Sequence, residues 1–100
     1  MFLNLSRPPR KGRNLTAFLG AGPALRFAAG VRDVWLEPEG VAARLLAVYY
    51  LPVVECKPEW LVYFTDPRCH TIPGLLAALR EQDPDVDPDS YVSLIFFEVT

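Results

Sequence analysis

The stretch EGVAARLLAVYY, residues 39–50, decides the fold because it fits two kinds of secondary structure. Wound as a helix, it places Val41, Leu45 and Val48 on one apolar stripe. Its content of Ala, Leu and Arg favours this helix. The alternative is a β-hairpin that turns at the initial Glu-Gly pair, because the closing Val-Tyr-Tyr has strand preference. We expect the helix and leave the hairpin open.

The segments on either side carry clearer signals. Strands are indicated by runs of β-branched and aromatic residues between turn residues. A helix is indicated where apolar side chains recur at i, i+3, i+4 and i+7 behind Thr71, a residue suited to the N-cap position. The predicted strands cover residues 31–36, 53–56, 60–65 and 91–99, and the second helix begins at residue 72 and is closed by the polar residues 80–82. The order β-α-β-β-α-β follows, which predicts an α+β, ferredoxin-like two-layer sandwich over residues 31–100.

The N-terminal part is predicted to be an arm. Residues 6–13, SRPPRKGR, favour an extended backbone, and the apolar residues before them allow a short edge strand. We therefore divide the 100-residue chain into a basic arm, residues 1–13, and a single α+β domain, residues 14–100. Gly and Pro interrupt residues 14–30, so their structure stays open between two short pieces around a turn.

One short stretch resembles a known family. Residues 18–22, Phe-Leu-Gly-Ala-Gly, resemble the opening of the Sir2-like dinucleotide-binding fold, in which a strand runs into a Gly-Ala-Gly turn that cradles a phosphate. The resemblance covers five residues, and Pro23 stands where that family has a small polar or apolar residue. A chain of 100 residues is also too short for the rest of that nucleotide fold, so no cofactor is expected.

Charge is distributed very unevenly along the chain. The net charge is −2, yet residues 1–32 carry +6 and residues 33–100 carry −8. Such polarity speeds the encounter with an oppositely charged surface. The predicted partner-binding residues are the bases of the arm and the acids of a Pro-rich loop: Arg7, Arg10, Lys11, Arg13, Asp83, Asp85, Asp87 and Asp89.

Catalytic and metal-binding patterns are weak. Cys56, Cys69 and His70 are too few, and wrongly spaced, for a structural zinc site. Nothing requires Cys56 to meet His70 as a nucleophile pair. The alternating acids of residues 83–89 put Pro88 where a calcium loop needs Gly. We predict no catalytic residue, metal or cofactor. Most aromatic side chains are expected in the core: Trp35, Tyr49, Tyr50, Trp60, Tyr63, Phe96 and Phe97.

The composition leaves a binding role as the main expectation. We expect a small cytoplasmic protein-protein interaction module, an inhibitor, immunity-type or assembly protein, that acts through its charged ends or a sheet edge or by self-association. One alternative is a ligand-binding or enzymatic domain with an aromatic pocket whose mouth carries Tyr63, Glu55 or His70. Another is a nucleic-acid-binding accessory protein that uses the arm. The longest apolar run, residues 45–54, is too short to span a bilayer.

Overall fold

The computed structural model of the chain describes residues 2–5, 8–22, 33–37 and 40–100, and of residues 2–4 and 33 it describes the backbone. The predicted piece over residues 23–30 lies outside these ranges. The described strands and helices, in chain order, are β1 (Phe2–Asn4), β2 (Gly12–Leu19), β3 (Asp33–Glu37), β4 (Val41–Pro52), the 3₁₀ helix η1 (Val53–Glu55), α2 (Pro58–Leu61), the 3₁₀ helix η2 (Pro67–His70), α3 (Ile72–Arg80) and β5 (Tyr91–Val99).

The strands form one curled sheet in the order β1-β3-β4-β5-β2. Neighbouring strands are antiparallel except at the edge, where β1 pairs with β3 in parallel. Strand β5 pairs with β4 on one side and β2 on the other, and its residues 92–97 are all buried. A strand covered on both faces has apolar residues at consecutive positions, and this confirms the strand predicted over residues 91–99.

The helix expected over residues 39–50 is wrong, because this segment is strand β4, the hairpin alternative. The turn from β3 uses Gly40 at φ +70°, and its backbone N–H donates to the Leu36 carbonyl at 2.8 Å. A β-bulge between Leu45 and Ala47 explains the misleading pattern. It shifts the alternation by one residue, so that Val41, Leu45 and Val48 all face the same apolar cluster. Spacings of four and three thereby imitate a helix.

The strands expected over residues 53–56 and 60–65 are also wrong. Residues 53–55 form η1, and Pro58 occupies the first turn of α2. Local backbone bonds close these turns, since the N–H of Trp60 donates to the Lys57 carbonyl at 2.9 Å, while the N–H of Val53 donates to the distant Ser90 carbonyl at 2.9 Å. Only Phe64 keeps a strand-like contact, as an isolated bridge to Leu15. Because β3 leads directly into β4, the order β-α-β-β-α-β is not confirmed, and the fold is a small α+β domain.

Helix α3 confirms the helix predicted behind Thr71, and it ends at Arg80, the first of the three polar residues expected to close it. The Thr71 hydroxyl oxygen caps it by accepting a hydrogen bond from the Gly74 N–H at 3.1 Å. Gly74 is required by a close approach, since a Cβ built there would lie 1.7 Å from the Arg68 carbonyl oxygen. The helix buries Leu75 and Leu79 against the sheet side of the core.

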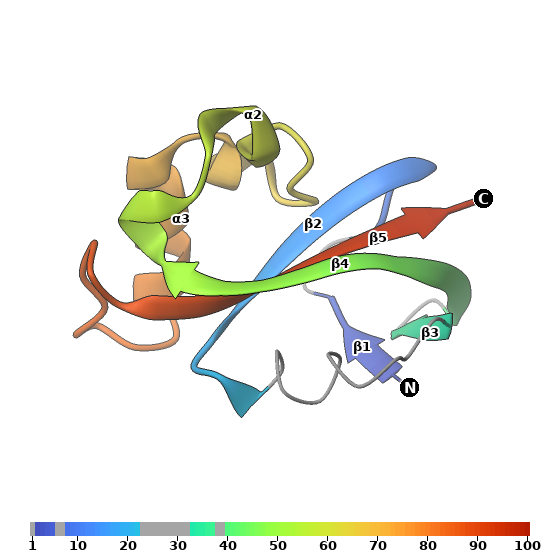
Figure 1. Cartoon of the computed structure of the whole chain (residues 1–100), viewed down its shortest axis with the longest axis horizontal. Helices are drawn as coiled ribbons and strands as arrows, with labels where there is room; N and C mark the ends of the chain where they lie inside the picture. The colour runs from blue at the N-terminus through green and yellow to red at the C-terminus, as the bar shows by residue number, and fades with distance from the viewer. Residues whose placement is uncertain (1, 6–7, 23–32, 38–39) are drawn as a thin grey trace.

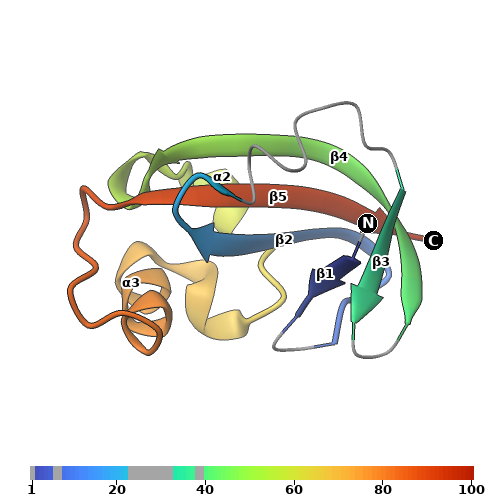
Figure 2. The ribbon, with the colours of Figure 1, turned by 90° about the horizontal axis from the view of Figure 1, so that it is seen from below.

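Apolar clusters lie on both faces of the sheet. One cluster fills the space between β2, β5 and the helices, with Leu15, Leu94 and Leu75 near its centre. The other lies inside the curl formed by β3, β4 and β5, around Leu36 and Phe97. Helices α2 and α3 gather toward one end of the sheet, and β1 and β3 lie toward the opposite end (Figures 1 and 2).

Candidate functional site

The predicted basic residues do not form a free arm over residues 8–13. The guanidinium of Arg10 donates to the carbonyl oxygens of Val62, at 3.1 Å, and Phe64, at 3.4 Å. Lys11 is exposed, and Arg13 lies in β2. Arg7 lies outside the described residues. Arg10 thus ties the basic segment to the residues that follow α2, whereas Lys11 and Arg13 are exposed to solvent.

A buried amide holds this segment in place. The side chain of Asn14 is fully buried at the start of β2. Its Oδ1 accepts from the backbone N–H of Arg10 at 2.9 Å, and its Nδ2 donates to the carbonyl oxygens of Arg10, at 2.6 Å, and Gly12, at 3.1 Å. Three hydrogen bonds therefore fix the turn over residues 10–14, and with it the direction in which Arg13 enters the sheet.

The predicted acidic residues form an ordered loop between α3 and β5. Asp83, Asp85, Asp87 and Asp89 are all exposed. The carboxylates of Asp83 and Asp87 accept backbone N–H bonds from the residues two positions later, at 3.0 and 2.8 Å. Val86 is buried and anchors the middle of the loop. These contacts shape the loop, and they leave carboxylate oxygens facing solvent.

The structure does not bring the two predicted charged sets together. The basic segment precedes Gly12, which pairs with Val99 at the end of β5, whereas the acidic loop leads into Tyr91 at its beginning. The two ends of this strand lie roughly 26 Å apart at the usual rise per residue. This separation exceeds the distance over which salt screens charges in solution, so attraction within one chain between the described bases and the acidic loop is weak.

The helix-bearing face of the sheet holds an aromatic groove, and Tyr63, expected at the mouth of an aromatic pocket, is among its lining residues. This groove has a volume of about 390 Å³ and lies between β2, β4 and β5 on one side and the segment around α2 on the other. We call it the aromatic groove and define it by its lining residues: Arg13, Leu46, Ala47, Tyr49, Trp60, Tyr63 and Phe96. Tyr49 and Leu46 are 42% and 39% exposed, so the groove opens to solvent.

The β-bulge of β4 directs two successive side chains into the aromatic groove. Leu46 has no register partner in β5, because Leu45 pairs with Phe97 and Ala47 pairs with Phe96. Both Leu46 and Ala47 line the groove. Bulges commonly re-aim a side chain next to a functional site. Without the bulge, strict alternation would place only one of these two residues on this face.

The aromatic rings are already packed in a fixed arrangement. Tyr49 stacks on Trp60 with ring centroids 4.9 Å apart and an interplanar angle of 21°. Phe96 meets the edges of both rings at 6.0 and 5.7 Å. The Lys57 ammonium lies 5.3 Å from the centre of the Trp60 ring. The walls of the groove are thus preorganised, which lowers the entropy that binding must overcome.

Arg13 places a positive charge in the lining of the aromatic groove. Among the described residues that line the groove, it is the only charged one. In the sheet register it stands opposite Glu98, which also stands opposite Arg44 on the other side. Within the described part of the chain, the ion pairs within 4 Å are those of Arg68 with Asp66 and with Glu81. Arg13 therefore makes no ion pair with another described side chain.

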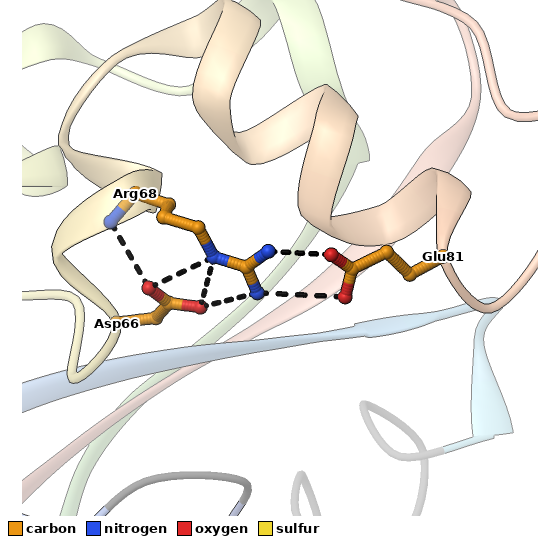
Figure 3. A network of polar contacts seen from close by, with 3 residues as sticks. All are labelled: Asp66, Arg68 and Glu81. Atoms are coloured by element: carbon orange, nitrogen blue, oxygen red, sulfur yellow. Dashed lines mark hydrogen bonds and ion pairs between the residues drawn. The ribbon is translucent and has the colours of Figure 1, made fainter.

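A second, smaller cavity of about 130 Å³ adjoins the β2 edge and α3. Figure 3 shows the network beside it, in which the Arg68 guanidinium lies between the carboxylates of Asp66 and Glu81. Hydrogen bonds to Asp66 and then to Glu81 raise the pKa of Arg68 above its ordinary value. Both carboxylates face this guanidinium, so the network ties η2 to the end of α3 and offers no free cation to a ligand.

The thiols and the histidine do not assemble a reactive site. Burial raises the pKa of the Cys56 thiol to about 11, so the thiol stays protonated and unreactive near neutral pH. Cys69 is buried, and His70 is exposed with its Nε2 3.3 Å from the Phe64 carbonyl oxygen. Across the described ranges, no group of three or more His, Cys, Asp or Glu side chains could hold a metal ion.

The expectation of an aromatic core holds for some rings and fails for others. Phe96 and Phe97 are buried, but Trp35, Tyr49 and Tyr50 are more than 40% exposed. We did not expect this exposure of Tyr49 and Tyr50, because the segment that carries them was predicted to be a largely buried helix. Had the hairpin been preferred, alternation alone would have placed Tyr49 and Tyr50 on opposite faces.

Comparison of the chain with protein-family models, curated protein sequences and solved structures finds no match. Among the residues that the structure describes, no helix is long and apolar enough to cross a membrane. The case for a function therefore depends on the geometry of the aromatic groove.

Proposed function

We propose that this chain is a small protein-protein interaction module that holds its partner in the aromatic groove. The observation that carries this proposal is a preformed, open groove of about 390 Å³ lined by Trp, Tyr, Leu and Arg side chains. Trp, Tyr and Arg are the residues most enriched at the energetic centres of protein interfaces. Exposed apolar side chains gathered on one face mark such surfaces more often than scattered ones do.

An open groove suits a side chain delivered by a larger partner better than it suits a free small molecule. Small-molecule sites enclose most of their ligand's surface. Here Leu46 and Tyr49, which line the groove, are 39% and 42% exposed, so solvent reaches the groove itself. Of the polar groups expected at a pocket mouth, Tyr63 lines the groove, and Glu55 and His70 do not. The polar groups thus do not converge as they do around an enclosed ligand.

The test compares two substitutions of exposed apolar residues. Leu46→Glu places a carboxylate in the groove, whereas Val54→Glu places one at a residue that is 55% exposed and lies outside the groove lining. Each variant and the unaltered chain are used as bait in an extract of the native host, and light scattering records self-association. We expect one stoichiometric protein partner, retained by Val54→Glu and lost by Leu46→Glu. Equal retention by both variants, or recovery of no protein with a strictly monomeric chain, would contradict the proposal.

A further inference from the structure

We propose that the partner enters the aromatic groove with an acidic linear segment, placing an apolar or aromatic side chain among the rings and an adjacent carboxylate on Arg13. This inference rests on the proposed function and specifies the chemistry of the occupant. The partner segment has the general form acid-aromatic-acid, and it belongs to a different protein from this one.

The apolar part of the occupant follows from the groove walls. Leu46, Ala47 and Phe96 form a floor on the sheet, and Tyr49, Trp60 and Tyr63 form the aromatic sides. Phe96 is only 8% exposed, so it forms an apolar and nearly covered part of this floor. A volume of about 390 Å³ accommodates one large side chain together with a short piece of its backbone.

The acidic part follows from the unpaired charge. Arg13 lines the groove, is exposed, and makes no ion pair with another described side chain. Its neighbour in the register, Glu98, is shared with Arg44. A guanidinium at the mouth of an apolar groove binds a carboxylate through two parallel hydrogen bonds. The Lys57 ammonium lies 5.3 Å from the centre of the Trp60 ring but is not part of the groove lining, so Arg13 is the cation that would meet the carboxylate.

Stacking on nucleobases fits this groove less well. A base needs a free aromatic face on which to stack. One neighbour of the Trp60 ring is the Tyr49 ring, stacked at 4.9 Å, and another is the Lys57 ammonium. The most favourable stacking platform of the groove is therefore already engaged, which favours an amino-acid side chain as the occupant.

The chain's own acidic loop is also a poor occupant. Its apolar residue, Val86, is buried at 4% exposure and its carbonyl oxygen accepts a hydrogen bond from Arg80 at 2.8 Å. Inserting Val86 into the groove of a second copy would require this loop to leave its own core. A partner with a freely accessible acidic segment meets no such cost.

The experiment titrates the folded, ¹⁵N-labelled chain with two blocked peptides, Gly-Asp-Phe-Asp-Gly and its neutral counterpart Gly-Asn-Phe-Asn-Gly. Backbone amide shifts and the Trp60 indole signal report on occupation of the groove. The variant is Arg13→Gln, and its matched control is Lys11→Gln, which removes an exposed cation that does not line the groove. Because both changes are at exposed side chains, both variants are expected to fold.

We expect the acidic peptide to shift the groove signals and to bind about fivefold more tightly than the neutral one, the upper range for an exposed ion pair. Arg13→Gln should abolish this preference, and Lys11→Gln should preserve it. Equal binding of both peptides, an unchanged preference in Arg13→Gln, or no groove shifts at all would overturn the inference. Shifts of the same groove signals by an oligothymidine, at lower concentration than the acidic peptide, would also overturn it.

Failure of this inference and failure of the proposed function give different results. If the two peptides bind equally while Leu46→Glu still loses the captured protein partner, the groove is an interaction site with a neutral occupant. If Leu46→Glu retains the partner, the groove is not the interaction site, whatever the peptides do.

Discussion

Replacing Asn14 with leucine should destabilise the protein more than any other single polar-to-apolar change of similar volume at the start of β2. The substitution keeps the size of a side chain that is fully buried. It removes three hydrogen bonds, at 2.9, 2.6 and 3.1 Å, and leaves the N–H and carbonyl of Arg10 without this partner. A net contribution of about 1 kcal/mol per bond gives a loss of about 3 kcal/mol.

This loss is large compared with the whole stability of the domain. A chain of this length has a free energy of unfolding of roughly 5–15 kcal/mol. Urea unfolding, followed by far-UV circular dichroism and tryptophan fluorescence, measures the change directly. With a urea dependence of about 1.5 kcal/mol per molar, the midpoint should fall by about 2 M.

A second variant separates hydrogen bonding from packing. Asn14→Asp keeps the acceptor for the Arg10 N–H but points a carboxylate oxygen at the carbonyls of Arg10 and Gly12. At pH 7 its loss should exceed that of Asn14→Leu, because a buried charge is added to the missing donor. A midpoint for Asn14→Leu within 0.5 M of the unaltered chain, roughly a quarter of the expected change, would refute this account of the basic segment.

Three further changes test the remaining contacts. Gly74→Ala should lower the free energy of unfolding by about 2 kcal/mol in urea melts, because its Cβ would meet the Arg68 carbonyl oxygen. Gly22→Ala is the control and should change the midpoint little, since nothing lies within 4 Å of a Cβ there. Equal midpoints of the two variants would contradict this expectation. Burial raises the pKa of Cys56 to about 11, so this thiol keeps its proton in the folded state at pH values where the unfolded thiol ionises. The free energy of unfolding should therefore fall as pH rises from about 9 toward 11. Cys56→Ala should remove this contribution of the thiol to the pH dependence of stability. Glu81→Gln should change stability by less than about 1 kcal/mol, since its side chain is 62% exposed, and a larger thermal shift would show that the network is worth more than its exposure implies.

Part of the fold could be predicted from local signals. Helix α3 follows from one apolar face and a threonine cap, and β5 follows from a long run that is apolar on both faces. Both elements are specified by residues close in sequence. They were therefore predicted at nearly the bounds that the structure shows.

The helix predicted over residues 39–50 failed because of one extra residue. The bulge at Leu46 converts the alternation of a strand into spacings of four and three, which helical periodicity also produces. Nothing within this segment separates the two cases. The pairing of β4 with β5 along nearly its whole length does, and that contact is long-range.

An aromatic pocket carrying Tyr63 was an alternative from the sequence, but the other residues that line the groove could not be chosen for the same reason. Arg13 was singled out for its charge alone, and its place in an aromatic groove depends on β2 lying beside β5. The acidic set was also chosen for charge, and the structure places it at the far end of the molecule from Arg13. Pattern analysis found the charged residues, but only the sheet order identifies which of them meets apolar surface.

The central claim, that the aromatic groove holds a protein partner, is tested most directly by site-specific photo-crosslinking. A photoreactive phenylalanine analogue is placed at position 46, inside the groove, or at position 54, outside it, and each chain is irradiated in an extract of the native host. We expect position 46 to give one dominant crosslinked protein, whose yield falls when the unaltered chain is added as a competitor. Position 54 should not crosslink that protein. Equal crosslinking of that protein from both positions, or none from position 46, would contradict the claim.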